Sequence, residues 1–333
     1  MKSNKTIQLF IKIGFLPLAK DKDGQPKVNL SNKMYLLINL FRILPLTVYL
    51  YLSISDLLSE DLNMKSVISS SFKAVGYIGG SGLAVILALT GQRLGPDALM
   101  GISEPCCWKN FILIGIVMSL YVFGNLMMEV PLFLKQSTLV ELLSFTFALI
   151  SITLLVILDY GVLMVTSFLW VKDLKTKLNI LIHATIVSAE TFEEILLDFE
   201  RLRHSMKILT TFFFPFTQAL AITSSYLGFV AEDVYSYGSL LPTLGIVISL
   251  NTVVNVLEDL YDLMEEAADK AEKQGLQSTT LREMQRFITV AAKIKRVGTF
   301  TGFGFFSIQR DTLTAMLSTT ITYIIILFQS IKT

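Results

Sequence analysis

Cysteine is almost absent from this 333-residue chain, and charge is scarce. The two cysteines, Cys106 and Cys107, are adjacent, so a disulfide between them would be strained and no metal-ligand set can form around them. Only 17% of the residues are charged, against about 25% in a typical soluble domain. The sequence therefore predicts neither a disulfide-stabilised nor an ordinary soluble protein.

The common catalytic motifs are also missing. The chain has no glycine-rich phosphate loop, no His-Glu-x-x-His, no nucleophile elbow and no credible triad. Its two histidines, His183 and His204, lie in a charged segment without a third ligand nearby, which favours surface residues over a metal site. We expect no enzyme activity and no cofactor. The net charge of +1 gives no indication of a nucleic-acid partner, and we expect none.

The N-terminal segment lacks the features of a signal peptide. Residues 1–33 carry seven lysines, and the apolar run from Ile7 to Leu18 is interrupted by Lys12 and Pro17. No unbroken apolar region precedes a cleavage site with small residues. We expect instead an amphipathic segment that lies at the inner surface of a membrane.

Long apolar runs dominate the rest of the chain. Hydrophobic residues make up 53% of the sequence, including 23 phenylalanines, and the runs approach the roughly 20 residues that a helix needs to cross a bilayer. The sequence predicts one all-α, polytopic membrane domain over residues 1–333 with seven transmembrane helices. These are Met34–Ile54, Val67–Thr90, Phe111–Phe133, Leu139–Leu169, Leu209–Val230, Leu240–Leu257 and Thr312–Ile331.

The basic residues predict the orientation of these spans. With the N-terminus inside, the inner segments hold 23 Lys and Arg residues and the outer segments hold three. Because basic residues concentrate on the cytosolic side, the N-terminus is predicted to be cytosolic and the C-terminus extracellular. The protein is thus expected in the plasma membrane as a multi-pass protein in contact with lipid.

Two long inner connections carry charge of both signs, over about 172–207 and 258–310. Each reads as helical, with acidic residues followed by basic ones, and the sixth span is predicted to continue into the second connection because Leu257, Leu260 and Met264 keep a helical period. Such helices are usually solvated, but they are also where subunits could meet below the bilayer.

Charged residues inside the predicted spans point to packed or functional positions. Lys73 and Glu129 both fall in the outer third of the membrane. They form either a structural salt bridge or part of an outward-facing polar cavity with Asn125, Ser224, Tyr226 and Asn251. Asp159 must face the interior, and Arg42 can extend its side chain to the inner surface. Gly76, Gly79, Gly80 and Gly82 are typical of a close helix-packing surface.

The last span carries a polar stripe. On a helix, Thr319, Thr322, Ile326 and Gln329 fall within about 80° of one another, followed by Ser330, while Leu313, Leu317, Ile324 and Phe328 cover the far side. Unpaired polar groups are costly in hydrocarbon, so the stripe must face protein or water. It could hydrogen bond to other helices or line a water-filled pathway, and periodicity alone does not choose.

The end of the chain resembles a known family. Gly304-Phe305-Phe306-Ser307-Ile308-Gln309-Arg310 leads to Thr322-Tyr323, five apolar residues and Gln329. This pattern resembles the C-terminal signature of the insect gustatory receptor family, within the seven-transmembrane insect chemoreceptor superfamily. The family has an inner N-terminus and long inner loops as well. Gln309 stands where the family usually has Asp, and Ser330 stands where it has Phe.

The resemblance implies a gustatory receptor that acts as a ligand-gated, non-selective cation channel in a sensory neuron. Four identical or related subunits would surround a pore formed by the helix over about 311–331, with the inner helices as a common anchor. The implied pore and gate residues are Thr319, Thr322, Ile326, Gln329 and Ser330. A small-molecule tastant would enter from outside among spans two to six, near Ser70, Lys73, Asn125, Glu129, Phe145, Ser224, Tyr226 and Asn251.

Two other seven-span classes are alternatives. A G-protein-coupled receptor needs an extracellular N-terminus, which the basic-residue count contradicts, and the chain has neither an Asp-Arg-Tyr nor an Asn-Pro-x-x-Tyr signature. A secondary transporter is expected to show internal repeats with broken helices at matching positions, and no two halves of this chain match.

Overall fold

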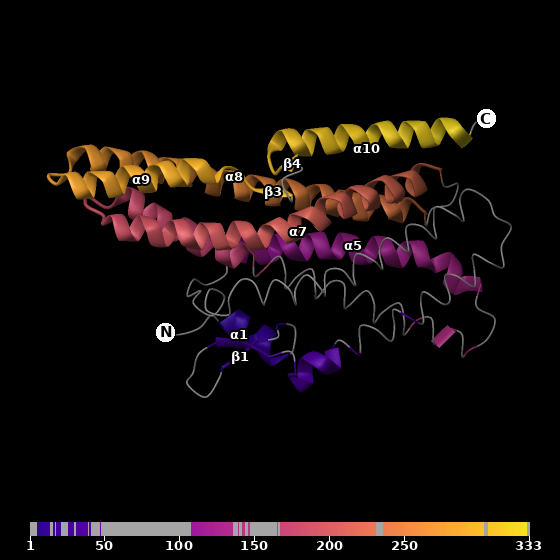
Figure 1. Cartoon of the computed structure of the whole chain (residues 1–333). Helices are drawn as coiled ribbons and strands as arrows, with labels where there is room; N and C mark the ends of the chain where they lie inside the picture. Colours follow the sequence, from indigo (N-terminus) through magenta and orange to yellow (C-terminus); the bar gives the residue numbers. More distant parts are fainter. Residues whose placement is uncertain are drawn as a thin grey trace.

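The computed structural model describes residues 5–13, 16, 18–20, 26–29, 31–38, 40, 47, 108–135, 139, 142–143, 146, 165, 167–230, 236–302 and 306–331. Within them lie the helices α1 (Lys5–Lys12), α5 (Trp108–Lys135), α7 (Ala189–Val230), α8 (Leu240–Gln277), α9 (Leu281–Val297) and α10 (Arg310–Ile331). A further helix covers 167–183, and a 3₁₀ turn, η1 (Ser236–Ser239), precedes α8. The long helices run roughly alongside one another (Figure 1).

Two small antiparallel strand pairs accompany the helices. β1 (Leu18–Lys20) pairs with β2 (Pro26–Val28) near the N-terminus. β3 (Thr301–Gly302) pairs with β4 (Phe306–Ser307) between α9 and α10. The fold is therefore helical, as the sequence predicts, but the linker before the last helix contains a hairpin that the sequence reading did not include.

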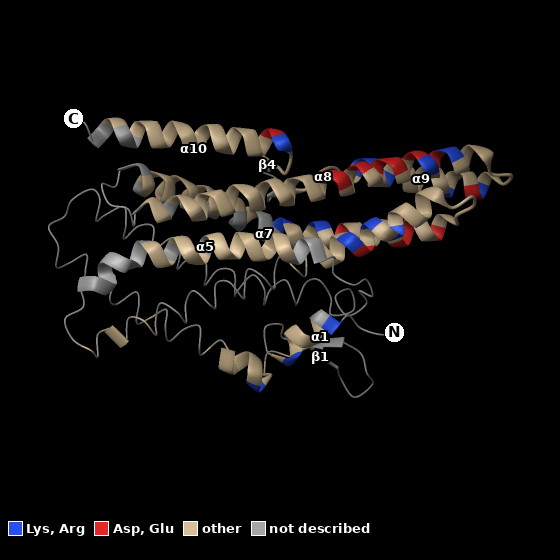
Figure 2. Ribbon diagram, turned by 180° about the vertical axis from the view of Figure 1, so that it is seen from behind, with Lys and Arg blue, Asp and Glu red and all other residues tan. Residues whose placement is uncertain are grey.

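The two longest helices each join an apolar half to a charged half. At 1.5 Å per residue, the 42 residues of α7 and the 38 of α8 extend for about 60 Å, roughly twice the thickness of a hydrocarbon core. Lys and Arg, like Asp and Glu, gather toward one end of these helices and on α9 (Figure 2). We call residues 172–207 and 258–297 the charged arm.

The structure confirms that the helix of the predicted sixth span continues beyond Leu257, because α8 runs without a break to Gln277. It also shows more than the sequence reading gave for α7. The sequence predicts an acidic helical segment and then the fifth span in this region, and the structure joins the two in one helix, Ala189–Val230, which includes Pro215. Among the described residues, one helix, α8, is long and apolar enough to cross a membrane, judged by length and composition. The mean hydropathy of its most apolar 18-residue window is 1.9.

Small residues let α9 pack closely along the charged half of α8. Ala267, Ala268 and Ala271 are buried on α8, and Phe287 and Val290 are buried on α9. Thr280 caps the start of helix α9, and its hydroxyl accepts a hydrogen bond from the Glu283 N–H at 3.4 Å. The helix ends at Gly298, whose φ of 67° is one that other residues rarely adopt. These two signals define the hairpin of α8 and α9.

Helix α1 packs on protein. The sequence reading places this amphipathic segment at the inner membrane surface. In the structure Ile7 is fully buried and belongs, with Leu16, to the main hydrophobic core. Its face around Ile7 therefore contacts the rest of the chain, while Leu9 on the same helix is 53% exposed, and the position of the segment at a membrane surface stays a prediction.

Candidate functional site

The linker between α9 and α10, of which the structure describes residues 298–302 and 306–309, is held on α7 by aromatic packing. Phe300 packs edge-on against Phe199 with ring centroids 5.3 Å apart, and Phe306 lies 5.8 Å from Phe214. Phe300 and Ile308 are each only 2% exposed. The Ile308 N–H donates to the Phe300 carbonyl at 2.8 Å, which closes the hairpin. The linker is thus a fixed base for the last helix.

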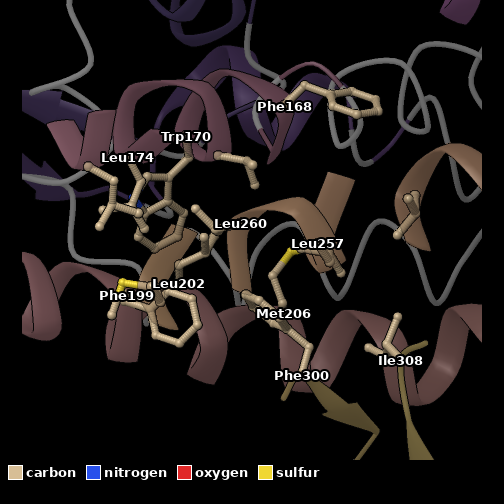
Figure 3. Close-up of a cluster of buried hydrophobic side chains, with 14 of the residues drawn as sticks. Phe168, Trp170, Leu174, Phe199, Leu202, Met206, Leu257, Leu260, Phe300 and Ile308 are labelled. Atoms are coloured by element: carbon tan, nitrogen blue, oxygen red, sulfur yellow. The ribbon is translucent and has the colours of Figure 1, made fainter. Parts of the chain in front are cut away.

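Four segments meet around this base. Phe168, Trp170 and Leu174 come from the helix over 167–183, and Leu257 and Leu260 come from α8. Figure 3 shows them grouped with Phe199, Leu202 and Met206 of α7 and with Phe300 and Ile308 of the linker. Burying each such side chain contributes about 1.5–3 kcal/mol relative to exposure. The motif residue Ile308 therefore serves packing.

Arg310, the first residue of α10, is bound to α8 in three ways. Its backbone N–H donates to Glu258 Oε1 at 2.7 Å, and its Nε lies 2.9 Å from Glu258 Oε2. The same Nε donates to Asn255 Oδ1 at 3.1 Å. A helix N-terminus has N–H groups without intrahelical partners, and it carries a partial positive charge. The Glu258 carboxylate accepts a hydrogen bond from one of these N–H groups, and its negative charge is favourable next to the positive helix end. Glu258 thus caps α10 from a different helix.

Helix α10 contacts the bundle through one narrow face. Leu313 and Thr320 are buried and Met316, Leu317 and Ile324 are half-buried, a spacing of three and four residues that places all five on one side. Thr319, Thr322, Ile326 and Gln329 are exposed on the other side. The side chains of Ser330 and Phe328 lie outside the described residues. The structure thus brings the predicted stripe together on the exposed face.

The hydroxyl groups of the stripe bind to their own helix. Thr319 donates to the Ala315 carbonyl at 2.8 Å, and Thr322 donates to the Ser318 carbonyl at 2.9 Å. Both threonines can therefore face either lipid or water at low cost. Gln329 is different, because an amide with two donors and an acceptor cannot satisfy itself on the backbone of a helix.

The predicted ligand-binding residues are only partly described. Ser70, Lys73 and Phe145 lie outside the described residues, and so do the side chains of Asn125 and Glu129 on α5. Ser224 and Tyr226 are buried on α7, while Asn251 is exposed on α8. The Ser224 hydroxyl bonds to Thr243 Oγ1, and Ser225 bonds to the same atom at 3.2 Å. This hydroxyl cluster joins α7 to α8.

Ser224 and Asn251 do not lie at the same level. Thr243, the partner of Ser224, precedes Asn251 by eight residues on α8, which is about 12 Å along the helix. Because Ser224 is buried and Asn251 is exposed, the structure separates two residues that the depth argument placed together. Ser224 and Tyr226 remain the candidates that face the interior among the described residues.

The charged arm is stabilised by ion pairs and by one lysine at a helix end. Lys270 Nζ donates to the carbonyls of Leu181 and Ile182 at 2.7 and 2.8 Å and also to that of Ala184. These groups end the helix over 167–183, where a positive charge is favourable. The sequence places Lys270 only in a helix of mixed charge. Its three carbonyl partners lie 86 to 89 positions earlier in the chain, and no local pattern indicates so distant a contact.

Two further lysines bridge elements of the arm. Lys295 of α9 lies 2.8 Å from Glu272 and 3.0 Å from Asp269 on α8, and its hydrogen bonds to them raise the pKa of Lys295 to about 12. Burial lowers the pKa of Lys177, but hydrogen bonds to Asp198 and Asp173 outweigh it and raise this pKa. Both ammonium groups therefore stay charged at any physiological pH.

A cleft of about 240 Å³ opens between α7 and β3. It is lined by Glu200, Arg203, His204 and Lys207 of α7 and by Thr301 of β3. Among the described residues, no group of three or more His, Cys, Asp or Glu side chains could hold a metal ion. The sequence reading treated His204 as a surface residue, and it is exposed.

Known structures share this fold. The chain matches the olfactory receptor OR5 from Machilis hrabei in complex with eugenol, with a TM-score of 0.73, 14% identity, and coverage of 98% of this chain and 97% of that one. A second structure of OR5 from Machilis hrabei matches with a TM-score of 0.70, 15% identity and the same coverage. No protein-family model matches the chain, and no curated protein matches it.

The similarity covers nearly the whole length of both chains, so it concerns the complete fold rather than a shared helical pair. The chain therefore has the fold of an insect olfactory receptor, which is a helical membrane protein. The seven spans and the orientation stay predictions from the sequence.

Proposed function

We propose that this chain is a subunit of a ligand-gated, non-selective cation channel, and that it works as a gustatory receptor in the plasma membrane of a sensory neuron. The fold similarity to insect olfactory receptors supports the general assignment as a chemoreceptor channel. The C-terminal motif supports the gustatory type. Four subunits, the same or related, would place their α10 helices around one pore.

The observation that carries the proposal is the exposed face of α10. The helix is fixed at its first residue and packed along one side, while Gln329 and the hydroxyl-bearing residues share the other side. An amide facing hydrocarbon is costly, whereas an amide facing water or a neighbouring copy of the helix is satisfied. In a central pore, the stripe on each α10 would face water and would also lie next to the α10 helices of the other subunits. Thr319, Thr322, Ile326, Gln329 and Ser330 are the proposed pore and gate residues.

The proposed ligand is a small organic molecule that enters from the extracellular side. The neighbour that carries eugenol supports a small-molecule ligand of this type. Ser224 and Tyr226, buried near the junction of α7 with α8, are the described candidates for its site. Ser70, Lys73, Asn125, Glu129, Phe145 and Asn251 stay proposals from their predicted depth. Gating requires that the ligand bind the open state more tightly than the closed one.

Whole-cell recording tests the proposal. The chain, expressed alone or with a related subunit, is expected to give cation current on addition of a tastant, and the current is expected to persist when G proteins are blocked. Single-particle images of the purified protein are expected to show fourfold symmetry around the C-terminal helices. Substrate uptake without conductance, or current abolished by the G-protein block, would contradict a channel.

The pore assignment makes its own prediction. Gln329→Ala removes the amide from the stripe, and Ser330→Phe restores the aromatic residue found in the resembling family. We expect each variant to change ion selectivity or the resting leak, because wetting of a narrow constriction depends on its polarity. Reversal potentials in solutions of different cations measure the change. Arg282→Gln, on the exposed face of α9, is the control. The assignment is wrong if both pore variants conduct as the wild type does.

A further inference from the structure

The cleft between α7 and β3 combines groups that recognise a phosphorylated sugar alcohol. Arg203, His204 and Lys207 supply N–H donors, and cationic donors are the usual partners of phosphate oxygens. Thr301 adds a hydroxyl from the opposite wall. Glu200 adds a carboxylate, which repels phosphate but accepts hydrogen bonds from hydroxyl groups. A ligand that carries both phosphate and hydroxyl groups matches this lining best.

The cleft lies where the helices change from charged to apolar. Lys207 is the last charged residue of α7, and the 23 residues that follow it in the helix, 208–230, carry none. Glu258 is the first charged residue of α8, and it binds Arg310 at the start of α10. The three residues therefore mark one boundary on three helices. From Lys207 to Glu200 the cleft spans about 10 Å along α7, which is enough to cover the roughly 5–7.5 Å depth of one headgroup layer.

We propose that this cleft binds the headgroup of a phosphoinositide in the inner leaflet of the membrane. The proposal rests on the predicted orientation, with the charged arm in the cytosol, and thus on the membrane topology of the proposed function. The inner leaflet is the anionic one, so its lipids meet the basic lining directly. A free inositol phosphate carries the same phosphate and hydroxyl groups as the lipid headgroup. At the level of the cleft, however, a lipid can place its headgroup against the lining while its acyl chains stay in the bilayer.

An occupied cleft joins α7 to the linker that precedes α10. Thr301 lies in β3, and the same short hairpin leads through β4 to Ile308 and Arg310. A headgroup that contacts both walls adds a bridge between α7 and the base of the last helix. Binding of the lipid therefore stabilises the anchored position of that helix.

The test measures lipid binding directly, without current. The purified full chain in nanodiscs of phosphatidylcholine is compared with the same chain in discs that contain a minor fraction of phosphatidylinositol bisphosphate, and bound phosphoinositide is quantified by native mass spectrometry. Arg203→Gln/Lys207→Gln is expected to bind about thirtyfold more weakly, the factor for two basic residues at an anionic surface. Arg203→Lys/Lys207→Arg keeps the charge and is expected to retain most of the binding.

The matched control is Lys273→Gln/Arg282→Gln, which removes the same charge from exposed positions of the arm. Lys273 lies 15 residues beyond Glu258, about 22 Å from the boundary. Equal weakening by this control would show a general charge effect and overturn the site. Unchanged binding by the Arg203/Lys207 variant would overturn it as well. Soluble inositol trisphosphate is added as a competitor to discs that contain phosphoinositide, and its own binding is measured in discs without phosphoinositide. If it displaces no phosphoinositide from the chain, or if it binds as tightly as the lipid does, the lipid headgroup is not the ligand.

Thermal unfolding in detergent verifies that each variant is folded, and the charge-keeping variant keeps the test decisive if the neutral one fails to fold. A chain that binds phosphoinositide but conducts no ions would contradict the channel and leave this site standing. A chain that conducts ions but does not bind phosphoinositide would support the channel and overturn this site.

Discussion

Gly124→Ala is expected to prevent normal assembly of the bundle, whereas Gly115→Ala in the same helix is expected to be harmless. A methyl group at Gly124 would lie 2.6 Å from the Gly238 carbonyl oxygen and closer still to the ring of Pro242. Neither neighbour is the flexible end of a side chain, so a helix would have to shift. Overpacking of this kind costs about 1–3 kcal/mol, and more where backbone is involved.

Gly115 supplies the control because a methyl group there meets nothing within 4 Å. Alanine also favours a helix by up to about 1 kcal/mol relative to glycine, so Gly115→Ala is expected to be neutral or stabilising. The measurements are the monodisperse fraction in gel filtration and the melting temperature in detergent. Wild-type behaviour of Gly124→Ala would mean that α5 does not approach η1 and α8 as closely as described.

The sequence indicated packing glycines in the second span, at positions that lie outside the described residues, and did not single out Gly124. The reason is that its partners, Gly238 and Pro242, are more than a hundred residues away in the chain. A glycine within an apolar helix is compatible with a close contact, but nothing in the local pattern says which glycine meets which neighbour.

Periodicity was informative where one helix face dominates. It predicted that α8 continues past Leu257, and it placed Leu313 and Leu317 opposite Thr319 and Thr322 on the last helix. Both inferences need only the 3.6-residue repeat and the fact that apolar side chains pack inward. The placement of the stripe on the exposed side follows from the same rule, although its role as a pore lining stays a proposal.

The continuity of α7 through Lys207 was not predicted, for a physical reason. A change from charged to apolar residues marks a change of surroundings, and a helix can continue through it. Residues 189–230 form one helix in spite of Pro215, which removes one backbone hydrogen bond from its interior. The hairpin of β3 with β4 was missed because strands of two residues carry no periodic signal.

The candidate ligand site shows the limit of an argument from depth. Ser224, Tyr226 and Asn251 were chosen because their spans place them in the outer half, but depth does not define the side of a helix. The structure puts Ser224 in a hydroxyl cluster with Thr243 and leaves Asn251 exposed. A span that is apolar all round gives no such information, because it has no distinct faces.

The resemblance in the C-terminal motif gains a physical explanation for one of its residues. Arg310 occupies the position of the family arginine, and its backbone and side chain both bind Glu258, 52 residues earlier. Gln309 stands where the family usually has Asp. Its Oε1 accepts a hydrogen bond from the Ser307 hydroxyl at 3.2 Å, a contact within the linker that a shorter carboxylate could also make.

Glu258→Ala is expected to release the start of α10 and to lower the ligand-evoked current of the proposed channel by about tenfold. The carboxylate accepts the Arg310 N–H at 2.7 Å and pairs with Nε at 2.9 Å, and its side chain is 23% exposed. Hydrogen bonds to a charged group contribute about 1.5–3 kcal/mol each when they are well shielded, and partial exposure reduces this to about 1–2 kcal/mol here. A bias of 1.4 kcal/mol changes a population ratio tenfold.

A graded series separates the two roles of Glu258. Glu258→Gln keeps an oxygen that accepts the Arg310 N–H but loses the ion pair, so its effect is expected to be smaller than that of alanine. Glu258→Arg/Arg310→Glu restores opposite charges but leaves the N–H of residue 310 without an acceptor, so rescue is expected to be incomplete. Glu266→Gln, exposed two turns further along α8, is the control.

Hydrogen exchange at residues 310–314 measures the release independently of conduction, since the first N–H groups of a helix exchange quickly once their cap is lost. Faster exchange in Glu258→Ala with normal current would mean that the cap serves stability alone. Unchanged exchange would show that another group holds α10. Full rescue by the charge reversal would mean that the side-chain pair is sufficient, and that the carboxylate does not act as the helix cap.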